Sequence, residues 1–599
     1  MPMDQAEKER LLKIIKKGNI HIHRGWKNFS KNIALPDVLV LDIKDIPSLQ
    51  TVMKTLYELN ASKAVDQRIL LRVAAGGKQK PYSESFSFTE GSTADVIIRL
   101  VGDDFNKIEK TNQPDVMRIG ASVQVGEADK MLYEEFNLSL PTASLIPYVT
   151  VSGLAANAGH GTGKDQPSFS GLIRKMTLCL PNGEITQIDD KHPDFDVIRG
   201  ANLGLFGVII NMELACTEAK KMQCIMQKRS IPELIEEIKN GLFLKDPYVS
   251  VMYVPTYQKD ELVNKEFKNV IIYRWQPIDK SNHDVNNNSS IMTYLGQQIE
   301  IDLEEGIHVV DLLRRHSRLI PYYNKYLVSQ IAIGKEDRLA VAPWYRMHYQ
   351  KAYPWDIVDA DYLFQVHKNC DEMVLALEKV VTTLDKFASE QQYPVIDAIY
   401  LRLFRGTSTN SGLSTSSHAD DTYVCGFDMV TSDGIAGYLE FREEMCQFFI
   451  NGPLKAKPHW GKYLPDIDYV KLYGKNYTAF LAALKNWYHD NNMKLDSSML
   501  LTDHFCQILQ LPYAPSLQKQ KKTAIEQVQS KTDDAKIIKS LCVRLDDKQD
   551  IHSINLKQQL LSTNIEREFN NPFTLFQMEP KREDSSEEAE KKKRCCVVQ

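Results

Sequence analysis

Residues 150–163 read TVSGLAANAGHGTG, and the interpretation of the whole chain starts from this stretch. Four of its residues are glycines and most of the others are small, so its backbone can lie close to a bound molecule. The backbone N–H groups of such a loop can converge on the phosphates of a large, flat ligand. A tight turn without a ligand is the alternative, because glycine is the usual turn residue. The neighbouring sequence decides between the two readings.

The composition is that of a globular protein, with 43% hydrophobic and 25% charged residues in a chain of 599. This length predicts two or more domains. The net charge of −5 gives no indication of nucleic-acid binding. The ten cysteines form no CxxC pair, which argues against a zinc site and a disulfide framework and fits a reducing compartment. The charged start lacks the apolar core of a signal peptide, and no apolar run would span a bilayer.

A second small-residue loop lies near the start of the chain. Residues 69–74 (ILLRVA) are predicted to form a buried strand, and they run directly into Ala75, Gly76, Gly77 and Lys78. A strand followed by such a loop is suited to binding a phosphate. Neither GxxxxGK[ST] nor GxGxxG is present, so a nucleotide-hydrolase loop and a doubly wound dinucleotide fold are not indicated. The same patterns predict strands at residues 38–43, 95–100, 116–125, 173–180 and 185–188, and helices at 46–59 and 128–135.

Two later stretches also carry candidate functional residues. Residues 396–405 (IDAIYLRLFR) alternate as a strand does, which places Tyr400 and Arg402 on one face. Residues 457–462 read KPHWGK. The region between the first domain and these stretches is less informative, although it contains strand-like and helix-like runs.

With these motifs in view, residues 20–215 resemble the flavin domain of the sugar-lactone oxidases, such as gulonolactone and arabinonolactone oxidases. These belong to the vanillyl-alcohol-oxidase (PCMH-type) FAD-binding proteins. The resemblance rests on GWKN at 25–28, RVAAGG at 72–77, the 150–163 stretch and LGLFGVI at 203–209, in the order and spacing of that family. KPHWGK resembles the HWxK motif of the same oxidases.

The resemblance implies an α+β fold class. A two-subdomain PCMH-type FAD-binding domain would be joined to a substrate (cap) domain with an antiparallel sheet and helices, followed by an extra C-terminal extension. The implied boundaries are 1–218 for the FAD-binding domain, 219–480 for the cap domain, 481–511 for a segment that returns to the FAD domain, 512–580 for the extension and 581–599 for a disordered basic tail.

The resemblance also implies which residues bind FAD. Many family members attach FAD covalently through a histidine in the first loop, but here Lys78 stands at that position, so we expect noncovalent FAD. No metal site is expected. The residues that would contact FAD are Ala74, Ala75, Gly76, Gly77, Lys78, Thr150, Gly153, Asn157, Gly159, His160, Gly161, Gly163, Gly207, Val208 and Ile209.

Oxidising an alcohol with a flavin requires a hydride to leave the carbon, a base to accept the hydroxyl proton, and the substrate to be held in line. In the family, an acid–x–Arg pair on a strand and the lysine of HWxK supply the polar groups. Arg402 matches the arginine and Lys462 the lysine, whereas Tyr400 stands where the family has the acid. Tyr400 is either a base whose pKa nearby cations lower, or a space-filling residue in a site that has lost its chemistry. His459 is either catalytic or structural.

The chain ends in Cys596–Val597–Val598–Gln599, a C-a-a-X sequence that favours a farnesyl group. The basic residues 591–594 lie just upstream, and Cys595 is a candidate for palmitoylation. One lipid anchors weakly, and a basic cluster or a second lipid strengthens the anchoring. We therefore expect a eukaryotic prenyltransferase as a partner and the cytosolic face of a membrane as the location.

Two hypotheses follow. In the first, the protein is a membrane-anchored FAD-dependent oxidoreductase that oxidises a polar, sugar-like alcohol or lactone and passes electrons to oxygen or another acceptor. In the second, it keeps the fold, with or without the flavin, but has lost the chemistry and acts as a binding or regulatory protein at a membrane. Arg402 and residues 459–462 favour the first hypothesis, and Lys78 and Tyr400 favour the second.

Overall fold

The structure is a computed structural model, and the chain divides into two compact units, Met1–Gln520 and Lys521–Gln599. All of the described residues belong to the first unit. Gly77, Lys78, Cys595 and Cys596 lie outside the described residues. The described residues are Lys13 and residues 18–29, 31–76, 94–142, 144–279, 303–331, 338–348, 357–406, 411–418 and 422–512.

A four-stranded sheet opens the N-terminal domain, in the order β1-β2-β4-β3. β1 is antiparallel to β2, whereas β2 and β3 both run parallel to β4. The first predicted helix is confirmed: the side chain of Asp45 caps it by accepting a hydrogen bond from the N–H of Ser48 at 2.8 Å. The bounds are β1 (Ile20–Lys27), β2 (Ala34–Ile43), α2 (Ile46–Ala61), β3 (Leu71–Ala74) and β4 (Val96–Leu100).

A second, antiparallel sheet of five strands has the order β5-β6-β10-β8-β9, and its β8–β9 pair is the predicted hairpin. The strand predicted at 116–125 was too long, because β6 ends at Gly120. Beyond it the N–H groups of Ser122 and Val123 bond to Phe105 and Gly120 carbonyls in a turn. The bounds are β5 (Ile108–Lys110), β6 (Val116–Gly120), α3 (Val125–Phe136), α4 (Val151–Ala156), β8 (Ile173–Cys179), β9 (Ile185–Asp189), α5 (Phe195–Gly200) and β10 (Val208–Ala215), with β7 (Leu138–Ser139) paired to β11 (Thr217–Glu218).

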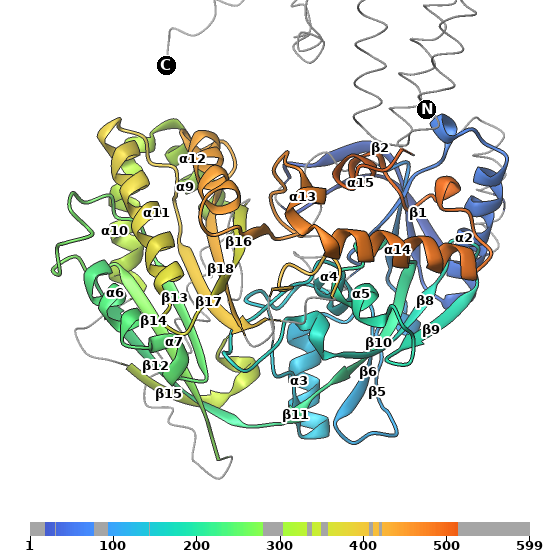
Figure 1. Cartoon of the computed structure of the whole chain (residues 1–599), viewed down its shortest axis with the longest axis horizontal. Coiled ribbons are helices and arrows are strands. Elements are labelled where there is room, and N and C mark those ends of the chain that lie inside the picture. The colour runs from blue at the N-terminus through green and yellow to red at the C-terminus, as the bar shows by residue number, and fades with distance from the viewer. Residues whose placement is uncertain are drawn as a thin grey trace, which may run out of the picture. The chain divides into compact units, whose positions relative to one another are not determined.

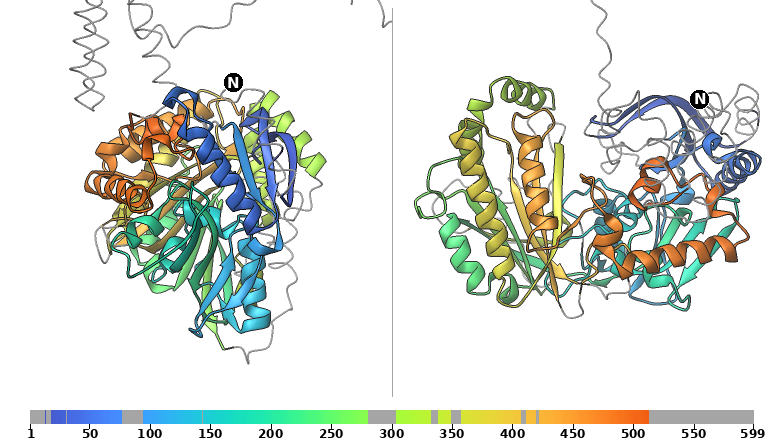
Figure 2. Two further views of the ribbon diagram at one scale, coloured as in Figure 1. Left: turned by 90° about the vertical axis from the view of Figure 1, so that its right-hand side faces the viewer. Right: turned by 45° about the horizontal axis from the view of Figure 1, so that its top comes forward.

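The cap domain is built on an eight-stranded sheet, in the order β15-β12-β14-β13-β17-β18-β16-β19. All its neighbouring strands are antiparallel, and α6, α11 and α12 lie along the sheet (Figures 1 and 2). The strands are β12 (Lys221–Arg229), β13 (Tyr248–Tyr253), β14 (Val270–Ile278), β15 (Arg338–Pro343), β16 (Ile357–Val366), β17 (Ile399–Arg405), β18 (Tyr423–Ser432) and β19 (Lys457–Pro458). The helices are α6 (Ile231–Lys239), α7 (Leu242–Lys245), α9 (Leu303–Arg315), α10 (Ile320–Ile331), α11 (Asp371–Ser389) and α12 (Tyr438–Cys446).

The chain then returns to the N-terminal domain, where the last three helices of the described residues pack into the core of that domain (Figure 1). The indole N–H of Trp487 donates to the carbonyl of Phe206 at 2.9 Å, and the hydroxyl of Tyr488 donates to the carbonyl of Leu205 at 3.0 Å. Both partners lie in the LGLFGVI stretch, so the C-terminal helices support that loop. The helices are α13 (Tyr469–Tyr473), α14 (Lys475–Asp490) and α15 (Asp503–Ile508).

Residues 159–166, which we call the crossing segment, pass from the N-terminal domain to the cap sheet. The N–H of Gly163 donates to the carbonyl of Leu403 at 2.8 Å, and the N–H of Arg405 donates to the carbonyl of Gln166 at 2.8 Å. The crossing segment therefore adds to the end of β17. Across the described residues, no helix is both long enough and apolar enough to traverse a bilayer.

Candidate functional site

A long cavity, the first cavity, lies in the N-terminal domain where four loops meet. One loop follows β3, one leads into α4, one leads out of α4, and one precedes β10. The space between atoms amounts to about 1120 Å³ including its open mouth, which is large enough for a dinucleotide-sized ligand. Of the residues predicted to bind FAD, the cavity is lined by Ala74, Ala75, Gly76, Thr150, Gly153, Asn157, Gly159, Gly207, Val208 and Ile209.

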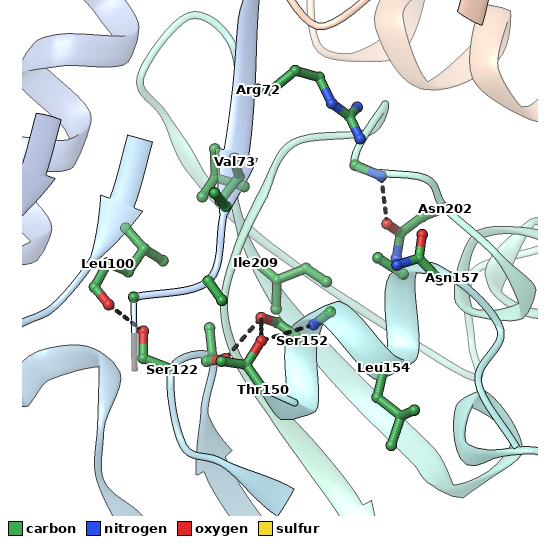
Figure 3. Close-up of a pocket in the computed structure, with 18 of the residues that line it drawn as sticks. Arg72, Val73, Leu100, Ser122, Thr150, Ser152, Leu154, Asn157, Asn202 and Ile209 are labelled. Atoms are coloured by element: carbon green, nitrogen blue, oxygen red, sulfur yellow. Dashed lines mark hydrogen bonds between the residues drawn. The ribbon is translucent and has the colours of Figure 1, made fainter. Parts of the chain in front are cut away.

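Two features of this lining fit an FAD molecule. A Cβ atom at Gly76 would lie 2.0 Å from the carbonyl oxygen of Leu100, so only glycine allows the loop to lie this close to β4. The amide nitrogen of Asn202 is buried without a hydrogen-bond partner among the described residues, although its carbonyl accepts from the N–H of Gly204. A buried donor of this kind is available to a polar ligand. Figure 3 shows Asn157 next to Asn202, across the cavity from Ser122.

The remaining predicted FAD contacts are placed differently. His160, Gly161 and Gly163 belong to the crossing segment and do not line the first cavity. The run of glycines therefore has two parts: the part up to Gly159 borders the cavity, and the rest leads to the cap sheet. Sequence spacing alone could not show where the chain turns away from the cavity.

A second cavity, of about 750 Å³ including its open mouth, lies against one face of the cap sheet and shares Val149, Leu154 and His459 with the first. Three carboxylates reach it from neighbouring strands: Asp359 and Asp361 from β16, and Asp428 from β18. Asp361 lies directly opposite Asp428 in the β16–β18 pairing, so the two side chains are on the same face of the sheet. The three carboxylates were not singled out from the sequence.

Arg402 and Tyr400 lie on the same face of β17 by strand alternation. Arg402 lines the second cavity, with a guanidinium nitrogen 3.5 Å from a carboxylate oxygen of Asp428. Tyr400 lies directly opposite Asp428 in the β17–β18 pairing, but it packs in the cap core and lines neither cavity. The carboxylate that the sequence lacked beside Arg402 is therefore supplied by the neighbouring strand. A catalytic role for Tyr400 remains a prediction.

The HWGK turn carries Lys462 and His459 to the cavity. The N–H of His459 donates to the carbonyl of Asp361 at 3.0 Å, and the N–H of Lys462 donates to the carbonyl of His459 at 3.0 Å, which closes the turn. Trp460 is buried, stacks on Tyr469, and donates its indole N–H to a main-chain carbonyl at 2.7 Å. Trp460 thus holds the turn in place.

Lys462 is the centre of the charged cluster. Its ammonium nitrogen lies 2.6 Å from Asp428, 2.7 Å from Asp359 and 3.8 Å from Asp361, measured to carboxylate oxygens. Burial acts to lower the pKa of Lys462, but Asp359 and Asp428 outweigh burial and raise it above its usual range. Lys462 is therefore an ammonium ion, held in place by carboxylates from two strands.

The two cross-strand carboxylates differ in their affinity for protons. Burial alone would raise the pKa of Asp361, but Lys462 and the hydrogen bond with His160 hold it well below its usual range. Burial raises the pKa of Asp428 to about 7, although Lys462 opposes the shift. Asp361 thus stays ionised, while Asp428 exchanges its proton near neutral pH. A pKa near the working pH is the property a general base needs.

His459 and His160 are both buried, with their rings 5.8 Å apart. Burial lowers the pKa of His459 to about 3, so the ring is neutral. Its Nδ1 accepts a hydrogen bond from the N–H of Gly461 at 3.0 Å, so its Nε2 carries the hydrogen and is a donor rather than a metal ligand. The ligand-type atoms of His160, Asp361 and His459 lie within 4.8 Å of one another, but this tautomer and the nearby Lys462 disfavour a cation there.

A family model described as an FAD binding domain matches residues 63–189. This range includes the loop after β3, α4 and the whole crossing segment. The match agrees with the first cavity as the place for FAD, because most of the cavity's loops fall within it.

Solved structures match over most of the chain. The cholesterol oxidase from B. sterolicum matches with a TM-score of 0.63 at 13% identity, over 82% of this chain and 98% of that one. A BBE-like 1 protein from Physcomitrella patens gives 0.54 at 11%, over 81% and 97%. The xylooligosaccharide oxidase from Myceliophthora thermophila C1 gives 0.51 at 12%, over 80% and 96%. The chain therefore has the α+β fold of these proteins: an FAD-binding domain joined to a large antiparallel sheet.

Proposed function

We propose that this protein is an FAD-dependent oxidoreductase that oxidises an alcohol carbon to a carbonyl, with oxygen or another acceptor taking up the electrons. The observation that carries the proposal is the cluster of Asp428, Lys462 and Arg402 in a cavity that shares residues with the proposed FAD cavity. Asp428 lies in this cavity beside the two cations, with one carboxylate oxygen that has no hydrogen-bond partner among the described residues, so it is placed to accept a proton from a bound alcohol.

FAD, when bound, supplies an acceptor for the hydride of the alcohol carbon. The hydroxyl proton goes to the ionised carboxylate of Asp428, so that the C–O–H group becomes C=O and two electrons leave the substrate. Arg402 and the Nε2–H of His459 are donors for the oxygen that becomes more negative as its proton leaves. Lys462 acts through Asp428: its fixed ammonium limits the rise in the pKa of that carboxylate.

The matched structures leave the rest of the substrate open, because their names refer to a sterol and to a sugar oligomer. The resemblance in the sequence favours a sugar-like alcohol or a lactone. The alternative hypothesis, a membrane-bound binding protein without chemistry, stays available as an outcome of the experiment below.

The experiment is anaerobic mixing of the purified holoenzyme with a panel of alcohols, followed by the flavin absorbance. We expect Asp428→Asn to retain FAD and to slow alcohol-dependent flavin reduction by roughly 10²- to 10⁴-fold, the usual contribution of a general base. Asp129→Asn is the matched control, because burial raises the pKa of Asp129 to about 7 as well, but Asp129 lines neither cavity. Equal rates in the Asp428 variant and the wild type would remove Asp428 from the mechanism.

We further propose that FAD is held noncovalently, because Lys78 stands where a covalently attached flavin would need a histidine. Acid precipitation of the yellow protein should then release the colour into the supernatant. Colour that remains with the precipitate would contradict this proposal. A colourless protein that also fails to take up added FAD would favour the alternative hypothesis.

We also propose that a prenyl group on Cys596 attaches the protein to the cytosolic face of a membrane. The support is the C-a-a-X sequence, together with the basic residues 591–594 and a neighbouring Cys595. A eukaryotic prenyltransferase is the partner that this proposal requires.

A further inference from the structure

The second cavity has one charged wall and one aliphatic wall. The charged wall consists of the groups described above. The aliphatic wall comes from the loop before α4, from α4 itself and from strands β16 and β18: Leu145, Ile146, Val149, Leu154, Ile357 and Val430. Ser144 also lines the cavity, but its hydroxyl donates to the carbonyl of Ile146. Among the described residues that line this cavity there is no Asn or Gln, whose amides pair with the donor and acceptor sides of hydroxyl groups.

Most of the polar groups on the charged wall already bond to each other. The ammonium of Lys462 has three N–H donors, and three carboxylates surround it at 2.6 to 3.8 Å. Three buried polar atoms of lining residues have no hydrogen-bond partner among the described residues: Asp361 Oδ1, Asp428 Oδ1 and Arg402 Nε. Together with the Nε2–H of His459, these atoms provide the donors and acceptors that one hydroxyl group needs, because a hydroxyl group donates one hydrogen bond and accepts one or two.

A sugar or lactone carries several hydroxyl groups around its ring. One of them would find partners at the charged wall, but the others would lie against aliphatic side chains that cannot replace their hydrogen bonds to water. An alcohol with an apolar body fits both walls. Its hydroxyl group bonds to the charged wall, and its body leaves water for the aliphatic wall, which is favourable.

We propose that the second cavity takes an alcohol with one reacting hydroxyl group on an aliphatic or alicyclic body, rather than a sugar or a sugar lactone. This inference rests on the proposed function, since it concerns the substrate of the same site. It departs from the sugar-like substrate that the sequence resemblance favours.

The test uses the full-length holoenzyme and measures anaerobic flavin reduction. The probes are 1-alkanols of four to eight carbons, 4-alkylcyclohexanols with alkyl groups of one to four carbons, D-glucose and L-gulono-1,4-lactone. We expect kcat/KM to rise with chain length by about fourfold per methylene in at least one series, the factor that corresponds to about 0.8 kcal/mol per buried CH₂. D-Glucose and the lactone should react at least tenfold more slowly than the best alcohol.

Two variants locate the effect in the cavity. Leu145 and Ile146 are half-buried loop residues, so Leu145→Ser and Ile146→Ser should fold and should reduce the dependence on chain length to less than twofold per methylene. Leu244→Ser is the matched control, because Leu244 is also half-buried but lines neither cavity, and it should keep the full dependence.

A binding measurement separates failure of this inference from failure of the proposed function. The tertiary alcohol 2-methyl-2-octanol has no hydrogen on its alcohol carbon, so it can bind without being oxidised; its affinity is measured by calorimetry. Faster reduction by D-glucose or the lactone would overturn this inference and leave the oxidoreductase proposal standing. A third outcome is that the tertiary alcohol binds, that Leu145→Ser weakens this binding, and that no probe reduces the flavin. This outcome would uphold the proposed ligand class and overturn the oxidoreductase proposal. If no probe reduces the flavin and the tertiary alcohol does not bind, the inference is overturned.

Discussion

At the scale of single residues, the site depends on how strongly the ammonium of Lys462 and the other neighbours stabilise the ionised form of each of three carboxylates. Lys462 lies closest to Asp428 and Asp359, yet it is Asp361 whose pKa is low and Asp428 whose pKa is high. The hydrogen bond from His160 stabilises the ionised form of Asp361 in particular. One carboxylate is therefore fixed as an anion, and its cross-strand neighbour is left to titrate.

The first prediction at this scale concerns pH. Because burial raises the pKa of Asp428 to about 7, the base is protonated and inactive below that pH. We expect kcat/KM for alcohol-dependent flavin reduction to rise about tenfold per pH unit up to about pH 7 and to level off above it. Stopped-flow measurements from pH 5 to 9 check this. Asp428→Asn should remove the rise, and a variant that kept it would assign the titration to another group.

Part of the site could be predicted from the sequence and part could not. Arg402 and Lys462 were found because each lies in a recognisable motif. The carboxylates were missed because they come from strands far apart in the sequence, and only the sheet pairing brings them together. A signal was present: Asp428 is a lone acid within the apolar run of β18, and a buried acid of that kind needs a partner.

At the scale of elements, strands β16, β17 and β18 and the crossing segment form the frame of the site. The ring of His160 stacks on Phe404 of β17 with centroids 4.7 Å apart and bonds to Asp361 of β16 at 3.1 Å. Between these two contacts the ring lies over Gly426 of β18, where a side chain would occupy the same space. A glycine in the middle of a strand thus allows the crossing segment to dock.

The prediction at this scale is that Gly426→Ala disturbs the docking. The added Cβ would lie 2.4 Å from Cε1 of His160, and the ring is held on its other side by Phe404. We expect a loss of about 1–3 kcal/mol in the free energy of unfolding, the usual cost of overpacking, measured by urea denaturation. Gly406→Ala is the control: its nearest contact would be 3.1 Å, so it should cost less than about 1 kcal/mol. Equal losses would contradict this account.

The elements themselves were predicted unevenly. The helix at Ile46–Ala61 and the β8–β9 hairpin were evident because each has a local signal, a cap in one case and a turn in the other. The cap sheet was hard to predict because strands such as β14 begin with a continuous apolar run, Val270–Tyr273, which is buried on both faces and shows no alternation. Their order in the sheet depends on long-range pairing, which leaves no local pattern.

At the scale of the whole molecule, the two proposals concern separate parts of the chain. The described residues form the two cavities within Met1–Gln520, whereas the proposed lipid site belongs to the unit Lys521–Gln599. An apolar substrate would be concentrated in the membrane to which the proposed lipid would attach the protein. The proposal of an apolar alcohol substrate and the proposal of a prenyl anchor are therefore compatible, although each rests on different residues.

The prediction at this scale concerns Cys596→Ser. In eukaryotic cells this variant should move from the membrane fraction to the soluble fraction, because it has no prenyl group and the basic residues alone bind weakly. Cell fractionation checks this, with Val597→Ile as the control, because that change keeps an aliphatic residue and so the C-a-a-X sequence. The purified variant should reduce its flavin as fast as the wild type. Unchanged membrane association would contradict prenyl anchoring.

The crossing segment also limits how this protein can be recombined. It belongs to the N-terminal domain in sequence, yet its backbone bonds to Leu403, Arg405 and Pro247 of the cap domain. A chimera that exchanged residues 219–480 for another cap sheet would leave these main-chain groups facing strands of a different register. Exchangeable modules in this protein therefore do not coincide with its domains, and a graft would have to carry residues 159–166 along with the sheet.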